Sequence, residues 1–301
     1  MKVLQGWGAA LVSMRRKVPP ENGFRQAGQR RPAGVGRWEH LFPWRHRELI
    51  WQLGRRDMLL RYRGSVFGLA WTILTPLALL GLYTLVFRHV FRLSWVQEGP
   101  DSNLDFALSL FAGMLIYQWA SELWGRAPRL ILEQPHLVTR VLFPLPALVW
   151  SALLAVSMQA LVAAGVWLAA CVLAGYAPYR AWLLLAIVPA SLLPWLLGLG
   201  WLLCSLGVFF RDLGQLIGFA LTGLLFLSPV FYPLEALPTW MRPIVEALPL
   251  AAPIEALRAI VLLHRAPDLG ALAGVFASGI VVALVGLFAM QRLRHGFADL
   301  L

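Results

Sequence analysis

The most concentrated group of functional side chains lies near the start of the sequence, within nine positions. It consists of four arginines and one aspartate: Arg55, Arg56, Asp57, Arg61 and Arg63. A guanidinium group is always charged and binds phosphate oxygens in a two-pronged geometry, so the group is suited to an anionic surface. The stretch that follows, Ser65–Phe87, has no charged residue. The arginines therefore stand directly before an apolar segment, where they would meet the phosphate groups of a bilayer.

An amphipathic helix within residues 38–64 would position these arginines. Leu49, Ile50, Leu53 and Leu60 are expected to share one face of this helix and to contact lipid, while the arginines point toward phosphates. Such a helix would lie in the plane of the membrane interface. The alternative is a plain topology signal that only holds the N-terminus inside, although two or three cations would meet that need.

Composition predicts that the chain is an integral membrane protein. Of its 301 residues, 59% are hydrophobic and 14% are charged, whereas soluble domains have about 25% charged residues. A transmembrane helix needs about 20 apolar residues. Six stretches are candidates: Ser65–Phe87, Leu104–Trp124, Val141–Tyr179, Ala181–Phe210, Leu213–Leu234 and Leu269–Gln291. The second is the weakest, because it carries Asp105 and Glu122. The expected fold is an all-α integral membrane protein with six transmembrane helices over residues 65–291.

The distribution of positive charge predicts the orientation of these helices. Fourteen of the 26 lysines and arginines lie in residues 1–63, and the formal net charge is +11. With the N-terminus in the cytoplasm, six spans place 20 of these 26 cations on the cytoplasmic side, as the positive-inside rule requires. We therefore predict a multi-pass protein of the cell (inner) membrane with both termini cytoplasmic, a mobile basic tail over residues 1–37 and a short tail over 292–301. Because the charge follows the membrane boundary, nucleic acid is not expected as a partner.

Two segments outside the spans are more elaborate than simple connections. The loop 126–146 contains a short amphipathic stretch, Ile131–Val141, and is predicted either to dock a partner or to be an ordinary cytoplasmic loop. The segment 229–263 has a proline every four to six residues, so no continuous helix can pass through it, yet it stays apolar. Re-entrant extracytoplasmic helices before the last span fit this pattern, because irregular backbone at membrane depth must be covered by protein or line a cavity.

Missing motifs disfavour several kinds of chemistry. The sequence has no G-x-x-x-x-G-K-[ST] loop, so this chain is not expected to bind ATP in the P-loop manner. Its six histidines lack metal-ligand spacing, and Cys171 and Cys204 are expected to be packing residues. The spans hold almost no ionisable groups, which disfavours an ion-coupled transporter and an intramembrane enzyme. Catalytic residues, resident cofactors and metals are therefore not expected, and energy for transport would have to come from outside this chain.

Aromatic residues are abundant in the spans. The chain has 14 Trp, 16 Phe and 6 Tyr. Most are expected to serve as interface belts or packing residues. Those that face a pore would offer flat surfaces along which sugar rings slide. This channel hypothesis is made for five residues: Trp71, Tyr83, Tyr117, Trp119 and Tyr232.

Two motifs resemble the signatures of ABC-2 type permeases that export polysaccharides. The first is LGRRDMLLRYRGSVFGLAWTILTPL (Leu53–Leu77), with Arg-Asp, Arg-Tyr-Arg, Ser, Gly, Trp and Pro in order. The second is FFRDLGQLIGFALTGLLFLSPVFYPLEALP (Phe209–Pro238), which has an Arg-Asp pair near its start and Ser-Pro-x-x-Tyr near its end. The resemblance covers roughly residues 40–295. It implies a six-span subunit that forms a homodimer and pairs with two copies of a separate ATP-binding-cassette ATPase, which binds ATP and Mg²⁺.

The resemblance also implies roles for particular residues. Leu49–Arg63 would be an interfacial gate helix, and residues 130–141 would be a coupling helix seated on the ATPase. The coupling residues would be Leu130, Ile131, Glu133, His136 and Arg140. Asp57, Arg211, Asp212, Ser228 and Pro229 would belong to the shared structural motifs. Because such exporters move glycans on a polyprenyl pyrophosphate lipid, Arg55, Arg56, Arg61 and Arg63 are expected to attract its anionic head group.

The leading functional hypothesis is therefore export of a lipid-linked polysaccharide such as O-antigen or capsule. The same architecture could export a teichoic-acid-like polymer, a glycolipid or a drug, since few intramembrane charges and many aromatic residues fit all of these. A membrane scaffold that transports nothing and an intramembrane enzyme are the rivals from other classes. A partner ATPase would argue against the scaffold, and activity without nucleotide would favour the enzyme.

Overall fold

The computed structural model describes residues 46–61, 67, 70–83, 85–86, 103–134, 144–176 and 179–297. Several sequence-based predictions fall outside this part: the tail over residues 1–37, the head-group residue Arg63, and the coupling residues His136 and Arg140. The side chain of Tyr83 also lies outside it. The role proposed for each of these residues stays a prediction.

Within the described residues the secondary structure is helical and contains no strand, which confirms the all-α class. The longer helices are α2 (Arg47–Arg61), α3 (Trp71–Tyr83), α4 (Asn103–Arg126), α6 (Pro146–Leu173), α7 (Ile187–Phe209), α8 (Leu213–Leu227), α10 (Ala251–Val261) and α11 (Leu269–Phe297). Short helices connect them: η6 (Ala127–Arg129), η7 (Arg180–Ala186), η8 (Leu234–Ala236) and α9 (Arg242–Glu246).

Three described helical segments are long and apolar enough to cross a membrane: Pro146–Leu173, Arg180–Phe209 and Leu269–Arg294. They coincide with three of the six predicted spans. Helix α8 is apolar but has only 15 residues, and α3 has 13. Helix α4 has 24 residues and carries charged groups at both ends. The structure therefore supports a multi-pass membrane protein, and the count of six spans stays a prediction.

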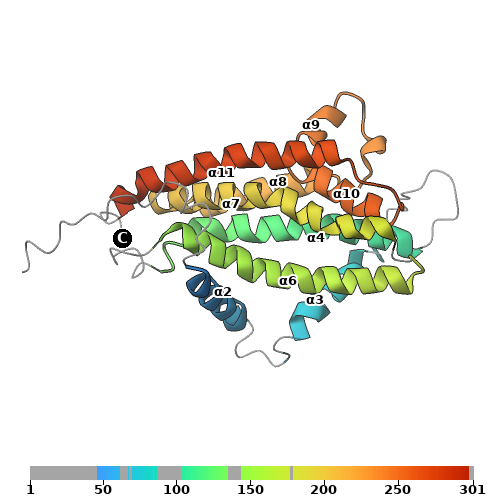
Figure 1. The fold of residues 1–301 in the computed structure, drawn as a ribbon, viewed down its shortest axis with the longest axis horizontal. Coiled ribbons are helices and arrows are strands. Elements are labelled where there is room, and N and C mark those ends of the chain that lie inside the picture. The colour runs from blue at the N-terminus through green and yellow to red at the C-terminus, as the bar shows by residue number, and fades with distance from the viewer. Residues whose placement is uncertain are drawn as a thin grey trace, which may run out of the picture. The chain divides into compact units, whose positions relative to one another are not determined.

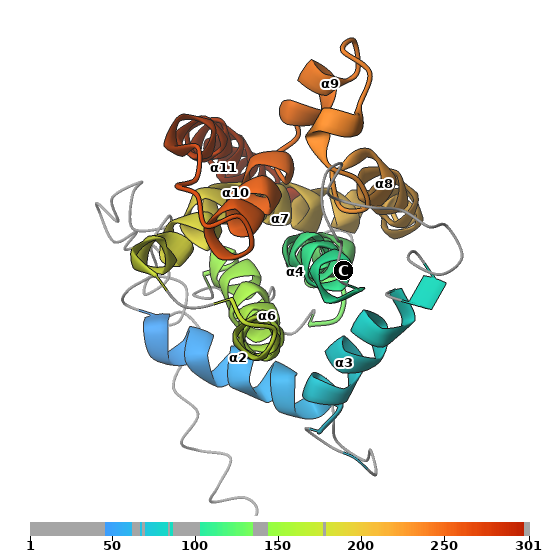
Figure 2. The same cartoon turned by 90° about the vertical axis from the view of Figure 1, so that its right-hand side faces the viewer.

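The long helices run side by side around α4 (Figure 1). The end-on view in Figure 2 shows α6, α7, α8 and α10 around α4. Leu110, Ala112, Ala120 and Leu123 of α4 are all fully buried. Helix α4 is therefore the central helix of the described bundle.

Helices α7 and α11 pack closely through glycines. A Cβ atom at Gly198 would lie 2.5 Å from the backbone nitrogen of Ala283, and one at Gly286 would lie 2.1 Å from the carbonyl oxygen of Gly198. Backbone-to-backbone contact of this kind maximises van der Waals packing where lipid supplies no hydrophobic driving force. The pair therefore forms a tightly fitted unit on one side of α4.

Helix α2 crosses the bundle instead of joining it (Figure 2). Its central Gly54 is buried against α6, where a Cβ atom would lie 3.0 Å from both Leu154 Cδ2 and the carbonyl oxygen of Ser151. The absence of a side chain at Gly54 lets the two helix backbones approach. This contact fixes which side of α2 faces the bundle.

The proline-rich segment is divided into short pieces, as the prolines predict. After α8 the chain passes through η8 and α9 before α10 begins at Ala251. Figure 2 shows α10 beside α4 and α7, with α9 projecting away from the bundle. Burial of Ile254 and Ile260 holds α10 in the protein core. Re-entry of this segment into a membrane stays a prediction.

Candidate functional site

One end of the bundle gathers the basic residues that the sequence places in the cytoplasm. Helix α4 ends there at Arg126, followed by Arg129 in η6. The guanidinium of Arg129 lies beside the start of α8, with its Nε 3.5 Å from the Cβ position of Gly214. The exposed motif pair Arg211 and Asp212 forms the turn between α7 and α8. These residues concentrate positive charge at this end of the bundle.

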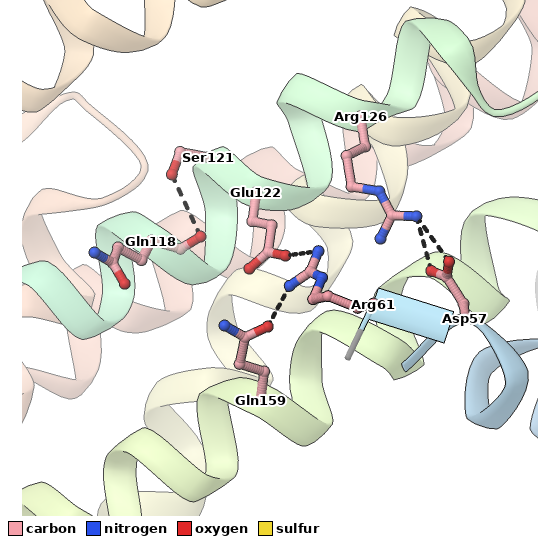
Figure 3. Close-up of polar contacts among 7 residues, drawn as sticks. All are labelled: Asp57, Arg61, Gln118, Ser121, Glu122, Arg126 and Gln159. Atoms are coloured by element: carbon pink, nitrogen blue, oxygen red, sulfur yellow. Dashed lines mark hydrogen bonds and ion pairs between the residues drawn. The ribbon is translucent and has the colours of Figure 1, made fainter. Parts of the chain in front are cut away.

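The inner side of α2 forms two ion pairs with α4 at this end (Figure 3). Arg126 Nη2 donates to Asp57 Oδ1 at 3.0 Å and lies 2.8 Å from Asp57 Oδ2. Arg61 pairs with Glu122 and also donates to the side-chain oxygen of Gln159 on α6. We call these residues the α2 charge cluster: Asp57, Arg61, Glu122, Arg126 and Gln159. The cluster joins three helices that are far apart in sequence.

In this cluster the acidic residue of each helix pairs with the basic residue of the other helix. On α2 the acid precedes the base by four residues, and on α4 Glu122 likewise precedes Arg126 by four. Asp57 meets Arg126 and Arg61 meets Glu122, so the two helices pair in opposite directions. A slip by one turn would bring two carboxylates or two guanidinium groups together, and like charges at such distances repel. The charges therefore favour this pairing over the one that such a slip would produce.

The outer side of α2 mixes arginines with large apolar side chains. Trp51, Leu59 and Leu60 are 50%, 49% and 47% exposed, and Arg55 and Arg56 are exposed as well. The predicted division into an apolar face and an arginine face stays a prediction. Packing of Gly54 on α6 turns the Asp57 and Arg61 side inward and leaves a mixed outer surface. A mixed surface of this kind suits the interface, where lipid tails and phosphates lie within one helix diameter.

The predicted coupling residues separate into buried and exposed members. Leu130 and Ile131 are buried in the core, so in this structure they anchor the segment and do not present a docking surface. Leu132 and Glu133 are exposed. We call residues 130–134 the docking turn. It follows η6 directly, and its backbone is closed by a hydrogen bond from Glu133 N to the carbonyl oxygen of Arg129 at 2.9 Å.

The predicted channel aromatics also differ in whether they are buried or exposed. Tyr117 and Trp119 are buried: the Tyr117 hydroxyl donates to the carbonyl oxygen of Leu221, and Trp119 Nε1 donates to Ser157 Oγ, each at 3.0 Å. In this structure these two rings join helices and offer no open face to a sugar, because their surfaces are already covered. Trp71 is 42% exposed and keeps the predicted role open.

Tyr232 has a structural position at the end of α8. Its hydroxyl donates to the carbonyl oxygens of Phe226 and Leu227 at 3.0 and 2.8 Å, both in the last turn of the helix. Helix ends leave such carbonyls without partners inside the helix. Tyr232 therefore caps α8, directly after the Ser228–Pro229 motif.

Arg258 is a buried charged residue to which the sequence analysis assigned no role. Arg258 is 3% exposed and forms an ion pair with Glu255 at 2.8 Å. Its guanidinium donates to the carbonyl oxygens of Ser109, Pro229 and Val230 at 3.0, 2.7 and 2.8 Å. The available signal was an arginine within an apolar helix, three residues after a glutamate. Arg258 ties α10 and the break after α8 to α4.

Comparison with known proteins places this chain in a family. Residues 48–262 match the family described as ABC-2 type transporter. An O-antigen export system permease protein RfbA of Myxococcus xanthus is 29% identical over 266 residues, which cover 85% of this chain and 96% of the relative. A Klebsiella pneumoniae protein of the same name is 22% identical over 255 residues, covering 84% and 95%. The matched region contains all of α2 except its first residue, together with the docking turn and both sequence motifs. The chain therefore belongs to the ABC-2 type transporter family and is a multi-pass membrane permease.

Proposed function

We propose that this chain is the membrane subunit of an exporter that moves a lipid-linked polysaccharide, such as O-antigen, out of the cytoplasm across the inner membrane. The observation that carries this proposal is similarity to O-antigen export permeases over more than four fifths of the chain and almost the whole of each relative. The chain works as a homodimer with two copies of an ATP-binding-cassette subunit, which bind ATP and Mg²⁺. The absence of a P-loop motif from this sequence supports that division of labour.

The exposed arginines of α2 support an anionic lipid as the carrier of the glycan. Arg55 and Arg56 lie on the outer surface of α2 with Trp51 and Leu59. Guanidinium groups bind phosphate strongly, and the neighbouring apolar side chains suit a lipid chain. In this proposal Arg55 and Arg56 draw the pyrophosphate head group to α2, and Arg63 contributes from just beyond it. Arg61 contributes less, since it is already engaged by Glu122 and Gln159.

The exposed part of the docking turn supports a cytoplasmic ATPase as the partner. Leu132 and Glu133 present an apolar and an acidic group at the end of the bundle that carries Arg126 and Arg129. Buried Ile131 anchors the turn to the protein. A force applied to Leu132 and Glu133 would therefore be transmitted into the bundle. This placement requires both chain termini to lie in the cytoplasm.

Depletion of this protein in its native host tests the function. Lipid-linked glycan should accumulate inside the cell and disappear from the surface, as measured by surface staining and by analysis of lipid extracts. Chemical analysis of the accumulated glycan then identifies the substrate. Unchanged glycan on both sides would refute polysaccharide export and favour a smaller amphiphile. If depletion stops export but no ATPase is found associated with this chain, a different energy source would be favoured.

Substitution of the exposed arginines tests the head-group role. The double variant Arg55→Gln/Arg56→Gln should lower the export rate at limiting substrate by roughly tenfold or more, because a charge-assisted hydrogen bond contributes about 1.5–3 kcal/mol. The matched control is Arg265→Gln, an exposed arginine at the other end of the bundle, which should export normally. Equal export by the double variant and the control would remove Arg55 and Arg56 from the substrate path.

A further inference from the structure

The α2 charge cluster lies immediately beside the docking turn in the chain. Arg126, which holds Asp57, is the last residue of α4, and η6 begins at the next residue. The docking turn starts directly after η6. Only three residues therefore separate the ion pair of α2 from the surface proposed to contact the ATPase. A displacement of the docking turn has a short covalent path to Arg126.

The segment between these two points is firmly packed. A Cβ atom at Gly207 of α7 would lie 2.1 Å from the carbonyl oxygen of Pro128, so η6 rests directly on the backbone of α7. Ala127 and Ile131 are fully buried on either side of this contact. Close-packed segments move as units and do not deform continuously. Movement of the docking turn therefore carries η6 and the end of α4 along with it.

We propose that the α2 charge cluster transmits movement of the docking turn to α2. In this inference, which rests on the proposed function, Asp57, Arg61, Glu122 and Arg126 are positioning residues for the transport cycle. The ATPase displaces the docking turn, Arg126 and Glu122 move with α4, and the two ion pairs move α2 in the same register. Nucleotide-dependent movement at the membrane interface then depends on four charges that do not themselves contact nucleotide.

Partial exposure suits these ion pairs to such a role. The side chains of Asp57 and Arg126 are 35% and 29% exposed, and those of Arg61 and Glu122 are 33% and 25% exposed. Water can therefore solvate the charges when a pair opens, so the pairs can separate without the large desolvation cost of a buried ion pair. The repulsion that follows a one-turn slip disfavours that arrangement. An ion pair that opens transiently therefore re-forms with the same partner, so α2 stays tied to α4 through the cycle.

Charge reversal provides the test, with fluorescence as the first measurement. A fluorophore at Trp51→Cys, on the exposed side of α2, should change its emission when ATP is added to the complex of this chain with its ATPase. Asp57→Arg alone and Arg126→Asp alone should abolish that change. The combined swap Asp57→Arg/Arg126→Asp should restore it, because opposite charges again face each other. Recovery by the swap would show that the ion pair itself, and not either charge alone, supports the nucleotide-dependent signal.

Export from vesicles that contain the same complexes is the second measurement. Each single reversal should lower glycan export roughly tenfold, the size of a typical coupling between sites, while ATP hydrolysis and ATPase binding remain. The swap should restore most of the export. The control Glu246→Arg, which disrupts an exposed ion pair on α9, should change neither signal.

The two measurements separate failure of this inference from failure of the proposed function. A wild-type complex that shows the ATP-dependent fluorescence change without moving glycan would refute the proposed substrate and leave the coupling intact. Single reversals that keep both the fluorescence change and export would overturn the coupling. A short cross-linker between Asp57→Cys and Arg126→Cys gives an independent check. Because the cross-link replaces the ion pair with a covalent tie, it should restore the ATP-dependent fluorescence change and the export that the unlinked double variant lacks, and no recovery would contradict the inference.

Discussion

Replacement of Arg258 by methionine should destabilise the protein more than any exposed charge substitution. The guanidinium of Arg258 is almost completely buried and supplies donors to three backbone carbonyls and to Glu255. Methionine has similar length and fills much of the same space without donating. The carbonyls of Pro229 and Val230 would then lose these donors inside the protein, whereas Ser109 lies within α4, whose helical hydrogen bonds remain. The proline-broken backbone after α8 cannot recover them through helical hydrogen bonds.

The size of the effect follows from these contacts. Removing one partner of a buried ion pair costs about 3–5 kcal/mol. The side chain of Glu255 is 28% exposed, so water offsets part of the cost of leaving it without Arg258. Each carbonyl that loses its donor lowers the free energy of unfolding by about a further 1–3 kcal/mol, and these costs are not additive. We expect a total of about 4 kcal/mol. With a shift of about 2–4 °C for each kcal/mol, Tm should fall on the order of 10 °C. Arg258→Lys keeps the positive charge but lacks the planar, forked set of donors of a guanidinium, so its Tm should fall by less than that of Arg258→Met.

The fall in Tm can be measured by heating the detergent-solubilised protein and recording how much of the folded peak remains in size-exclusion chromatography. The matched control is Arg242→Met, which removes an exposed arginine with a glutamate partner four residues away on α9. Its Tm should equal that of the wild type. Arg258→Met with a Tm within about 2 °C of the wild type would refute the reasoning, because it would show that the carbonyls find other donors.

Three further predictions concern packing. Gly198→Val should separate α7 from α11 and prevent folded accumulation, whereas Gly165→Val, in open space on α6, should accumulate normally in the same membrane-fraction blot. Gly54→Val should displace α2 from α6 at a cost of about 1–3 kcal/mol, detected as faster proteolysis of α2 with an unchanged bundle core. The thiol of Cys204 is fully buried and should resist maleimide in the folded protein but react after unfolding in SDS, and rapid labelling before unfolding would contradict its placement.

The sequence alone was sufficient to predict the class of the protein and the places where its helices are interrupted. Charge-free runs such as Leu269–Gln291 predict membrane spans because the cost of burying charge in lipid depends on composition and length. The prolines from Pro229 onward predict short helices because each proline removes a backbone donor, whatever surrounds it. The order of residues in two motifs indicated the family that the comparisons then confirmed.

Only the tertiary structure decided which side of each helix faces protein. The rotation of α2 depends on contact between Gly54 and α6, about a hundred residues later in the chain. That contact brings Arg61 to Glu122 and Gln159, although both Arg61 and Arg55 remain exposed to solvent. The same holds for Ile131, predicted to dock a partner but buried, because η6 is pressed against α7.

Arg258 shows the limit most clearly. A lone arginine in an apolar helix is explained only by the carbonyls that a distant proline break leaves without donors. Composition and local spacing determine where a chain can enter a membrane, whereas pairing of polar groups depends on which segments the fold brings together.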